Sequence, residues 1–214
     1  MNNGIIHRFE THRHSSIWIA QIAEVISTLS EEQIERYQAG HSLERTHQLA
    51  CADALASQML NHPTQIVRDT EGGPHLSDVV ERVSISHTGN YMAMLISPSP
   101  VLALDIEIMD RDVERIIPRY SERPELEQFS DLGVKNPGLY VWGIKECLFK
   151  AVPVNGILFK DHLKIKQTVG NEAVVSHCEV EHPNLRAQLS VVSRIFEPLI
   201  VSYVDQAKYG HEKI

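Results

Sequence analysis

The chain has 214 residues, of which 43% are hydrophobic and 22% are charged, as in an ordinary globular protein. Its net charge of −8 at pH 7 argues against general nucleic-acid binding and against binding to an anionic membrane, since both normally need clustered positive charge. The length allows one large domain or two halves of about 100 residues each.

The cysteines and the N-terminus bear on the compartment. Cys51, Cys147 and Cys178 are odd in number and widely spaced, so they form neither a CxxC metal pattern nor an evident disulfide framework. The sequence shows no apolar signal core and no apolar run approaching the roughly 20 residues that span a bilayer. We therefore expect a soluble cytoplasmic protein with reduced cysteines. His12 and His14 lack a third spaced ligand and are expected to be solvent-exposed.

The N-terminal third is expected to be mainly helical. Residues 16–27 fit either a strand or a buried helix on pattern alone. Ser30, with Gln33 three residues later, forms a capping-box arrangement and predicts a helix that Gly40 ends. A longer helix is predicted over residues 42–60, and it ends before a His-Pro pair because the residue before proline leaves the helical region.

The rest of the chain alternates between strand and helix patterns. Short β-type segments at 82–86, 91–97 and 101–107 are separated by turn residues, which predicts an antiparallel meander. The stretch 118–138 is punctuated by Pro and Gly and is expected to be mobile. A helix is predicted around 142–152, and strand patterns follow it.

These elements predict an α+β fold of two related halves, each an antiparallel sheet packed with a long helix. The expected halves are residues 1–104 and residues 105–214. No sequence repeat establishes the duplication.

Two acids stand close together in "LALDIE". Asp105 and Glu107 are two residues apart, so a strand would point both carboxylates to one face and Leu104 and Ile106 to the other. Like charges on one face repel unless a cation lies between them. Taken alone, the pattern favours solvated acids at a strand end, and a cation site is the alternative.

The segment "VWGIKECLFK" carries charges in an otherwise apolar helix. At 100° per residue, one face holds Tyr140, Ile144, Cys147, Leu148 and Ala151, and the opposite face holds Trp142, Glu146 and Lys150. The simplest interpretation is a solvated Glu146–Lys150 pair worth a few tenths of a kcal/mol. The alternative makes Glu146 a third carboxylate for a metal and Lys150 a cation for an anionic substrate, and three oxygen ligands suit Mg²⁺.

The segment "SISHTG" ends a strand with Ser86 and His87. A serine hydrolase is a poor interpretation, because neighbouring strand residues point apart and the sequence has no GxSxG elbow. A histidine that contacts phosphate is the functional interpretation of His87, and a hydrogen-bonded structural histidine is the default for this hexapeptide alone.

In chain order these segments resemble the 4′-phosphopantetheinyl transferase superfamily, particularly its longer, monomeric Sfp-type branch. That family has an SISH-like segment, a (V/I)G(I/V)D(I/V)E strand and a W-S-x-K-E-x-x-x-K helix. The matching segments are "SISHTG" at 84–89, "LALDIE" at 102–107 and "WGIKECLFK" at 142–150, with weaker similarity in "LSEEQIERY" at 29–37, "ERT" at 44–46 and "GGP" at 72–74. The similarity covers most of the first 150 residues, and the remainder matches only in texture.

The resemblance implies a transferase that moves the 4′-phosphopantetheine group of coenzyme A to a serine of an apo acyl or peptidyl carrier protein. Adenosine 3′,5′-bisphosphate is released. It further implies the two-halved fold of the family, with CoA-binding elements in residues 1–104 and the metal site and catalytic helix in residues 105–214. A monomer that uses Mg²⁺, or alternatively Mn²⁺, is expected, with no nucleic-acid or membrane partner.

The same resemblance implies roles for individual residues. The implied magnesium ligands are Asp105, Glu107 and Glu146. The implied CoA contacts are Arg45, Ser86, His87, Lys145 and Lys150. Lys150 would bind the phosphate under attack, and Glu146, or a water held by the metal beside it, is the candidate base for the serine proton. Lys145 is expected either to contact CoA or to be solvated.

Three departures from the family pattern leave other functions open. Gly73 replaces the lysine of G-K-P, Ala103 replaces the glycine of the strand motif, and Gly143 replaces the common serine of the helix motif. Weaker CoA binding would follow, so one alternative is a catalytically impaired protein that binds CoA or a carrier. A second is a metal-dependent phosphohydrolase that uses the same carboxylates. A plain α+β interaction module would leave the ordered motifs unexplained.

The carrier protein also needs a docking surface. Carriers of this kind are usually acidic around the reactive serine, and this chain is acidic overall, so local contacts are expected to dominate. We expect segment 118–138 to form part of that surface. The residues expected there are Arg119, Tyr120, Arg123 and Phe129.

Overall fold

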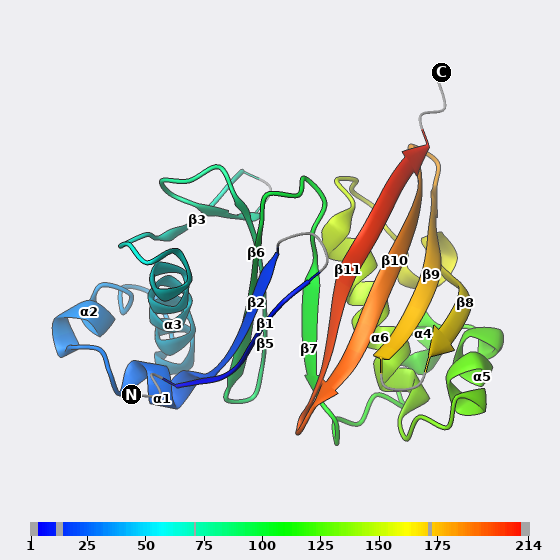
Figure 1. Cartoon of the computed structure of the whole chain (residues 1–214), viewed down its shortest axis with the longest axis horizontal. Helices are drawn as coiled ribbons and strands as arrows, with labels where there is room; N and C mark the ends of the chain where they lie inside the picture. Colours follow the sequence, from blue (N-terminus) through cyan, green and yellow to red (C-terminus); the bar gives the residue numbers. More distant parts are fainter. Residues whose placement is uncertain (1–3, 12–14, 71, 171–172, 211–214) are drawn as a thin grey trace. The chain divides into compact units, whose positions relative to one another are not determined.

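A computed structural model describes residues 4–11, 15–70, 72–170 and 173–210, with the side chains of 206–210 left out (Figure 1). His12 and His14 therefore lie outside the described residues. The chain divides into two compact units, Met1–Pro100 and Val101–Ile214. Each unit holds an antiparallel sheet and helices, which confirms the α+β prediction. The boundary that we expected after residue 104 would fall inside the first strand of the second unit.

The first unit is built on a six-stranded sheet in the order β1-β2-β6-β5-β4-β3, and its described pairings are antiparallel. Its strands are β1 (Ile5–Glu10), β2 (Ser16–Gln21), β3 (Ile66–Arg68), β4 (Pro74–Leu76), β5 (Arg82–Thr88) and β6 (Tyr91–Ser97). Its helices are α1 (Ile22–Ile26), α2 (Glu31–Glu35) and α3 (Leu43–Leu60). The ambiguous residues 16–27 thus contain both a strand and a short helix.

Local capping defines two of these helices. The capping box of Ser30 and Gln33 is present, but α2 ends at Glu35, well before Gly40. The prediction of a helix over residues 42–60 is confirmed, because α3 spans Leu43–Leu60 with Ser42 as its N-cap. The Ser42 hydroxyl accepts a hydrogen bond from the Arg45 N–H. Small buried side chains of α3 pack against the sheet and form the core of this unit.

The second unit is built on a five-stranded sheet in the order β7-β11-β10-β9-β8, again with antiparallel pairings. Its strands are β7 (Leu104–Ile108), β8 (Leu163–Gly170), β9 (Ala173–His182), β10 (Leu185–Phe196) and β11 (Leu199–Gly210). Its helices are α4 (Ile117–Tyr120), α5 (Arg123–Asp131), α6 (Pro137–Ala151) and α7 (Phe159–His162).

The predicted three-strand meander is wrong for its third member. Strands β5 and β6 pair as expected, but β7 pairs with β11 in the sheet of the second unit. Pro98 and Pro100 lie between β6 and β7, and proline has no N–H to donate to a strand ladder. The chain therefore leaves the first sheet at this point instead of turning back along it.

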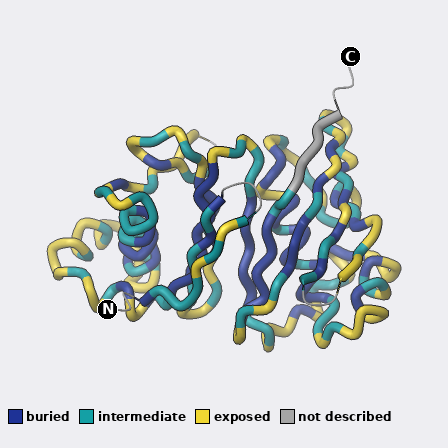
Figure 2. Tube along the Cα trace, in the orientation of Figure 1, coloured by how far each residue is buried: buried dark blue, intermediate teal, exposed yellow. Residues whose placement is uncertain are grey.

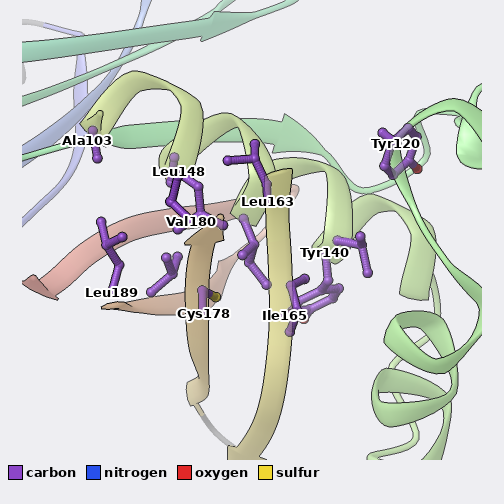
Figure 3. Close-up of a cluster of buried hydrophobic side chains, with 14 of the residues drawn as sticks. Ala103, Tyr120, Tyr140, Leu148, Leu163, Ile165, Cys178, Val180 and Leu189 are labelled. Carbon is purple, nitrogen blue, oxygen red and sulfur yellow. The ribbon is translucent and has the colours of Figure 1, made fainter. Parts of the chain in front are cut away.

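Helix α6 packs over β7 and β11 and closes the core of the second unit. The predicted apolar face is confirmed, because the five residues expected on it are all buried. Figure 3 shows Tyr140 and Leu148 of this helix among side chains that include Leu163, Ile165 and Val180 from the strands.

Cys51, Cys147 and Cys178 are buried and free, which confirms the prediction of no disulfide framework. Within the described part of the chain, no helix combines the length and apolar character needed to cross a membrane.

The stretch 118–138 is not an irregular surface loop, because it contains the end of α4, all of α5 and the start of α6. Tyr120 is 2% exposed and Phe129 is fully buried, so both belong to the core and the prediction that they form a docking surface is wrong. The Tyr120 hydroxyl donates to the Gly138 carbonyl at 3.0 Å. Arg119 and Arg123 are exposed. Figure 2, in the orientation of Figure 1, shows exposed stretches of chain where α5 lies.

This placement of Phe129 predicts a loss of stability. Phe129→Ala empties a packed site beside Tyr140, whose ring centroid lies 5.7 Å away, and should lower the free energy of unfolding by about 3–5 kcal/mol. Urea denaturation followed by circular dichroism measures the loss. The control is Leu132→Ala, at a position that is 36% exposed and should change stability far less. Equal losses in the two variants would contradict the core position of Phe129.

Candidate functional site

The acidic pair lies beneath helix α6. Asp105 and Glu107 share one face of β7 by strand alternation, and Ala103, just before this strand, belongs to the hydrophobic cluster packed around α6 (Figure 3). Each carboxylate residue is only 4% exposed. The interpretation that these are solvated acids at a strand end is therefore wrong, and their charge needs compensation from neighbouring groups.

Lys150 supplies part of that compensation. Its ammonium group donates to Asp105 Oδ1 at 2.8 Å and to the Leu104 carbonyl at 3.0 Å. Burial alone would lower the pKa of Lys150, but the charges of Asp105 and Glu146 outweigh it and raise the pKa above its usual value. Lys150 thus forms its ion pair with Asp105 on the strand, and not with Glu146 one turn away on the helix as the simplest interpretation expected.

Glu107 is held by two other side chains. Its Oε1 atom accepts a hydrogen bond from Trp142 Nε1 at 2.7 Å. The same atom forms an ion pair with the Arg111 guanidinium. The guanidinium carbon lies 5.6 Å from the centre of the Trp142 ring, within range of a cation–π contact. Sequence analysis missed Arg111. Arg111 lies four residues after Glu107, a spacing that suggests an ion pair on a helix. The sequence around them has no helix pattern, so this spacing did not predict the contact.

Glu146 completes a cluster of three acids on two elements. Burial, together with the charges of Asp105 and Glu107, raises the pKa of Glu146 to about 7, while Lys150 and Arg111 oppose the shift. In the described part of the chain its carboxylate forms no direct hydrogen bond or ion pair. The structure therefore brings Asp105, Glu107, Glu146 and Lys150 together, with one carboxylate poised to exchange a proton near neutral pH.

An aromatic row supports this cluster. Trp142 meets Tyr120 edge-on at 5.1 Å between ring centroids and stacks on Phe159 at 5.7 Å. Phe159 in turn contacts Phe149 at 5.4 Å, and Phe149 is 45% exposed. The row runs from the core to the surface and fixes the ring whose N–H binds Glu107.

Lys145 lies on another side of α6, inside the unit. It has no exposed surface, and its ammonium group donates to Glu125 Oε2 at 2.8 Å and to the Phe159 carbonyl at 3.2 Å. Burial lowers its pKa and the neighbouring Glu125 opposes that shift. The expectation of a solvated Lys145 is wrong, and a side chain so enclosed is not presented to a bound CoA.

The remaining predicted residues, Arg45, Ser86 and His87, belong to the first unit. Arg45 lies in the first turn of α3, half-buried, with its guanidinium donating to Gln48 Oε1 at 3.2 Å. Ser86 and His87 occupy successive positions of β5, and Ser86 is 7% exposed while His87 is exposed. The two side chains therefore face opposite sides of the strand, as the rejection of a Ser-His hydrolase assumed.

The positions that depart from the family pattern have distinct surroundings. A Cβ at Gly73 would lie 2.9 Å from Asp69 Oδ2, and that carboxylate also bonds His75 Nε2 at 2.8 Å. A Cβ at Gly143 would lie 3.2 Å from Ser202 Oγ and 3.5 Å from Asp105 Oδ2. Gly143 thus allows α6 to approach the acid-bearing face closely, whereas Gly73 leaves room for an Asp-His pair.

The chemistry of the acid cluster suits a hard divalent cation. Three carboxylates supply the oxygen ligands that Mg²⁺ prefers, with space in its coordination shell for substrate oxygens. Among the described residues, no three His, Cys, Asp or Glu side chains are arranged so that they could already coordinate one metal ion. Asp105 and Glu107 instead face Lys150 and Arg111, whose positive charges neutralise the same two acids that a metal would.

Comparison with known proteins gives no family assignment. No protein-family model matches the chain, and a search of curated proteins finds no match.

The raised pKa of Glu146 predicts a pH dependence of stability. Its ordinary pKa is 4.5 and its folded value is about 7, so between these values the folded protein holds a proton that the unfolded chain releases. The contribution of Glu146 to stability then falls as pH rises through this window. Glu146→Gln removes this titration. When the pH is raised from 4 to 8, the free energy of unfolding of the variant should therefore increase relative to that of the wild type by on the order of 2 kcal/mol.

Urea denaturation in EDTA at the two pH values measures this difference. Comparison with the wild type cancels the titration of all other groups, and Glu114→Gln, at an exposed position of the same unit, serves as the matched control. A Glu146→Gln variant that tracks the wild type at both pH values would contradict the raised pKa.

Proposed function

We propose that the protein transfers the 4′-phosphopantetheine group of coenzyme A to a serine of an apo acyl or peptidyl carrier protein. The observation that carries this proposal is the cluster of Asp105, Glu107 and Glu146 with Lys150 in the second unit. These four residues come from two of the three segments that carry the family resemblance, and they meet although about 40 residues separate β7 from the end of α6. The two-halved transferase fold is part of the same proposal.

The proposed reaction is a displacement at phosphorus. The carrier serine Oγ forms a bond to the β-phosphorus of CoA, the anhydride P–O bond breaks, and adenosine 3′,5′-bisphosphate leaves. The serine proton goes to the base, which is Glu146 or a water beside it. Lys150, already charged beside Asp105, would neutralise negative charge on the phosphate under attack.

Asp105, Glu107 and Glu146 would hold Mg²⁺, or alternatively Mn²⁺. When bound, the cation would neutralise the pyrophosphate and so reduce the repulsion that an incoming serine oxygen meets. Arg45, Ser86 and His87 are proposed CoA contacts on the strength of the family resemblance. Lys145 is withdrawn from this set because it is fully buried in its pair with Glu125.

A direct assay tests the proposal. A panel of apo carrier proteins is incubated with this protein, CoA and Mg²⁺, with an EDTA control, and intact mass is measured. A gain of about 340 Da on a carrier serine that EDTA abolishes would support metal-dependent transfer. Phosphopantetheine released to water without carrier labelling would favour a phosphohydrolase, and CoA binding without either product would favour an impaired binding protein.

Substitution at Asp105 tests the site within this assay. Asp105→Asn keeps the shape of the side chain but removes the charge that pairs with Lys150, so transfer should fall at least about 100-fold while the fold survives. The control is Asp110→Asn, an exposed position just beyond β7. Wild-type turnover in Asp105→Asn would refute the assignment of this acid.

A further inference from the structure

A buried charge pair lies behind the acid cluster, at the junction of four elements of the second unit. Glu125 of α5 is 5% exposed and Lys145 of α6 is fully buried. Glu125 Oε2 accepts from Lys145 at 2.8 Å, from Ser121 Oγ at 3.2 Å and from the Glu122 N–H at 3.0 Å. Its Oε1 accepts from the Ile165 N–H of β8 at 3.0 Å. The Glu125 carboxylate is therefore held from several sides, and it in turn fixes the position of the Lys145 ammonium group.

Lys145 also contacts Phe159, the first residue of α7. Its ammonium group donates to the Phe159 carbonyl at 3.2 Å. Three residues earlier on α6, the Trp142 ring stacks on the Phe159 ring, with centroids 5.7 Å apart and planes 25° apart. Helix α6 therefore holds Phe159 at two points, by its backbone through Lys145 and by its ring through Trp142.

The contact series ends at the acid cluster. Trp142 Nε1 donates to Glu107 Oε1 at 2.7 Å, so the indole ring contributes, together with Arg111, to the orientation of that carboxylate. A buried ion pair adds little net stability, because the loss of hydration offsets the attraction. Its fixed geometry is then what the pair contributes.

We propose that Lys145 is a positioning residue that acts through Phe159 and Trp142 to orient Glu107. This inference deepens the proposed function and rests on it only for the identity of the ligand that Glu107 would bind. Orienting groups behind metal ligands commonly affect metal affinity about 10-fold or more when removed. The proposal therefore has two measurable consequences, one at Trp142 and one at the acid cluster.

The experiment uses fluorescence quenching and Mn²⁺ titration of the full chain. The sequence contains two tryptophans, so a Trp18→Phe background leaves Trp142 as the sole reporter. Lys145→Met alone would strand the Glu125 charge, so it is combined with Glu125→Gln to keep the site neutral. In this folded variant, acrylamide quenching of Trp142 should increase and the Kd for Mn²⁺ should rise about 10-fold.

A second variant keeps the proposal testable if the buried pair proves necessary for folding. Phe159→Leu removes the stacked ring but leaves the Lys145–Glu125 pair in place, and it should produce the same two changes. The control is Ile195→Ala, which shortens a 47% exposed apolar side chain on β10 of the same unit, outside the aromatic row, and should leave both readouts at wild-type values.

The outcomes separate this inference from the proposed function. Unchanged quenching in either folded variant would overturn the positioning of Trp142, and increased quenching with unchanged Mn²⁺ affinity would overturn its effect on Glu107. Failure of the Trp18→Phe protein itself to bind Mn²⁺ would count against the metal site of the proposed function. The quenching result would then still decide the role of Lys145.

Discussion

Two carboxylates buried beneath one helix impose the main constraint on the second unit. Asp105 and Glu107 face α6 from β7, and each is only 4% exposed. Burying such charges is costly unless each gains a partner, and the surrounding residues meet that need. Lys150 pairs with Asp105, and Trp142 and Arg111 bind Glu107. The polar face of α6 is thus determined by the strand it covers.

The close approach of α6 depends on residues that carry no charge. Gly143 lies where a Cβ would come within 3.2 Å of Ser202 Oγ and 3.5 Å of Asp105 Oδ2, so a side chain here would crowd the contact between α6 and the strands. Asn136 caps the helix by accepting the Leu139 N–H. The absence of a side chain at Gly143 and the fixed start of the helix together keep Glu146 within range of the acids on the strand.

Sequence patterns predicted which side chains share a face of a strand or helix. They did not predict which side chains from distant segments pair with one another. Strand alternation placed Asp105 and Glu107 on one face, and helical periodicity separated the two faces of α6. The same patterns could not show that Lys150 pairs with an acid 45 residues away, or that Glu125 encloses Lys145. The prolines of segment 118–138, which we expected to be mobile, lie in the first turns of α4, α5 and α6, where proline is favoured.

The charge balance of the cluster connects its structure to its proposed chemistry. Among the described residues, Asp105, Glu107 and Glu146 interact with the cations Lys150 and Arg111. Asp105 and Glu107 hold the direct contacts, and burial, together with the charges of these two acids, raises the pKa of Glu146 to about 7. A divalent cation would supply further positive charge and make full ionisation of Glu146 favourable. Because ionised ligands and metal stabilise each other, metal affinity should strengthen as pH rises through the titration of Glu146.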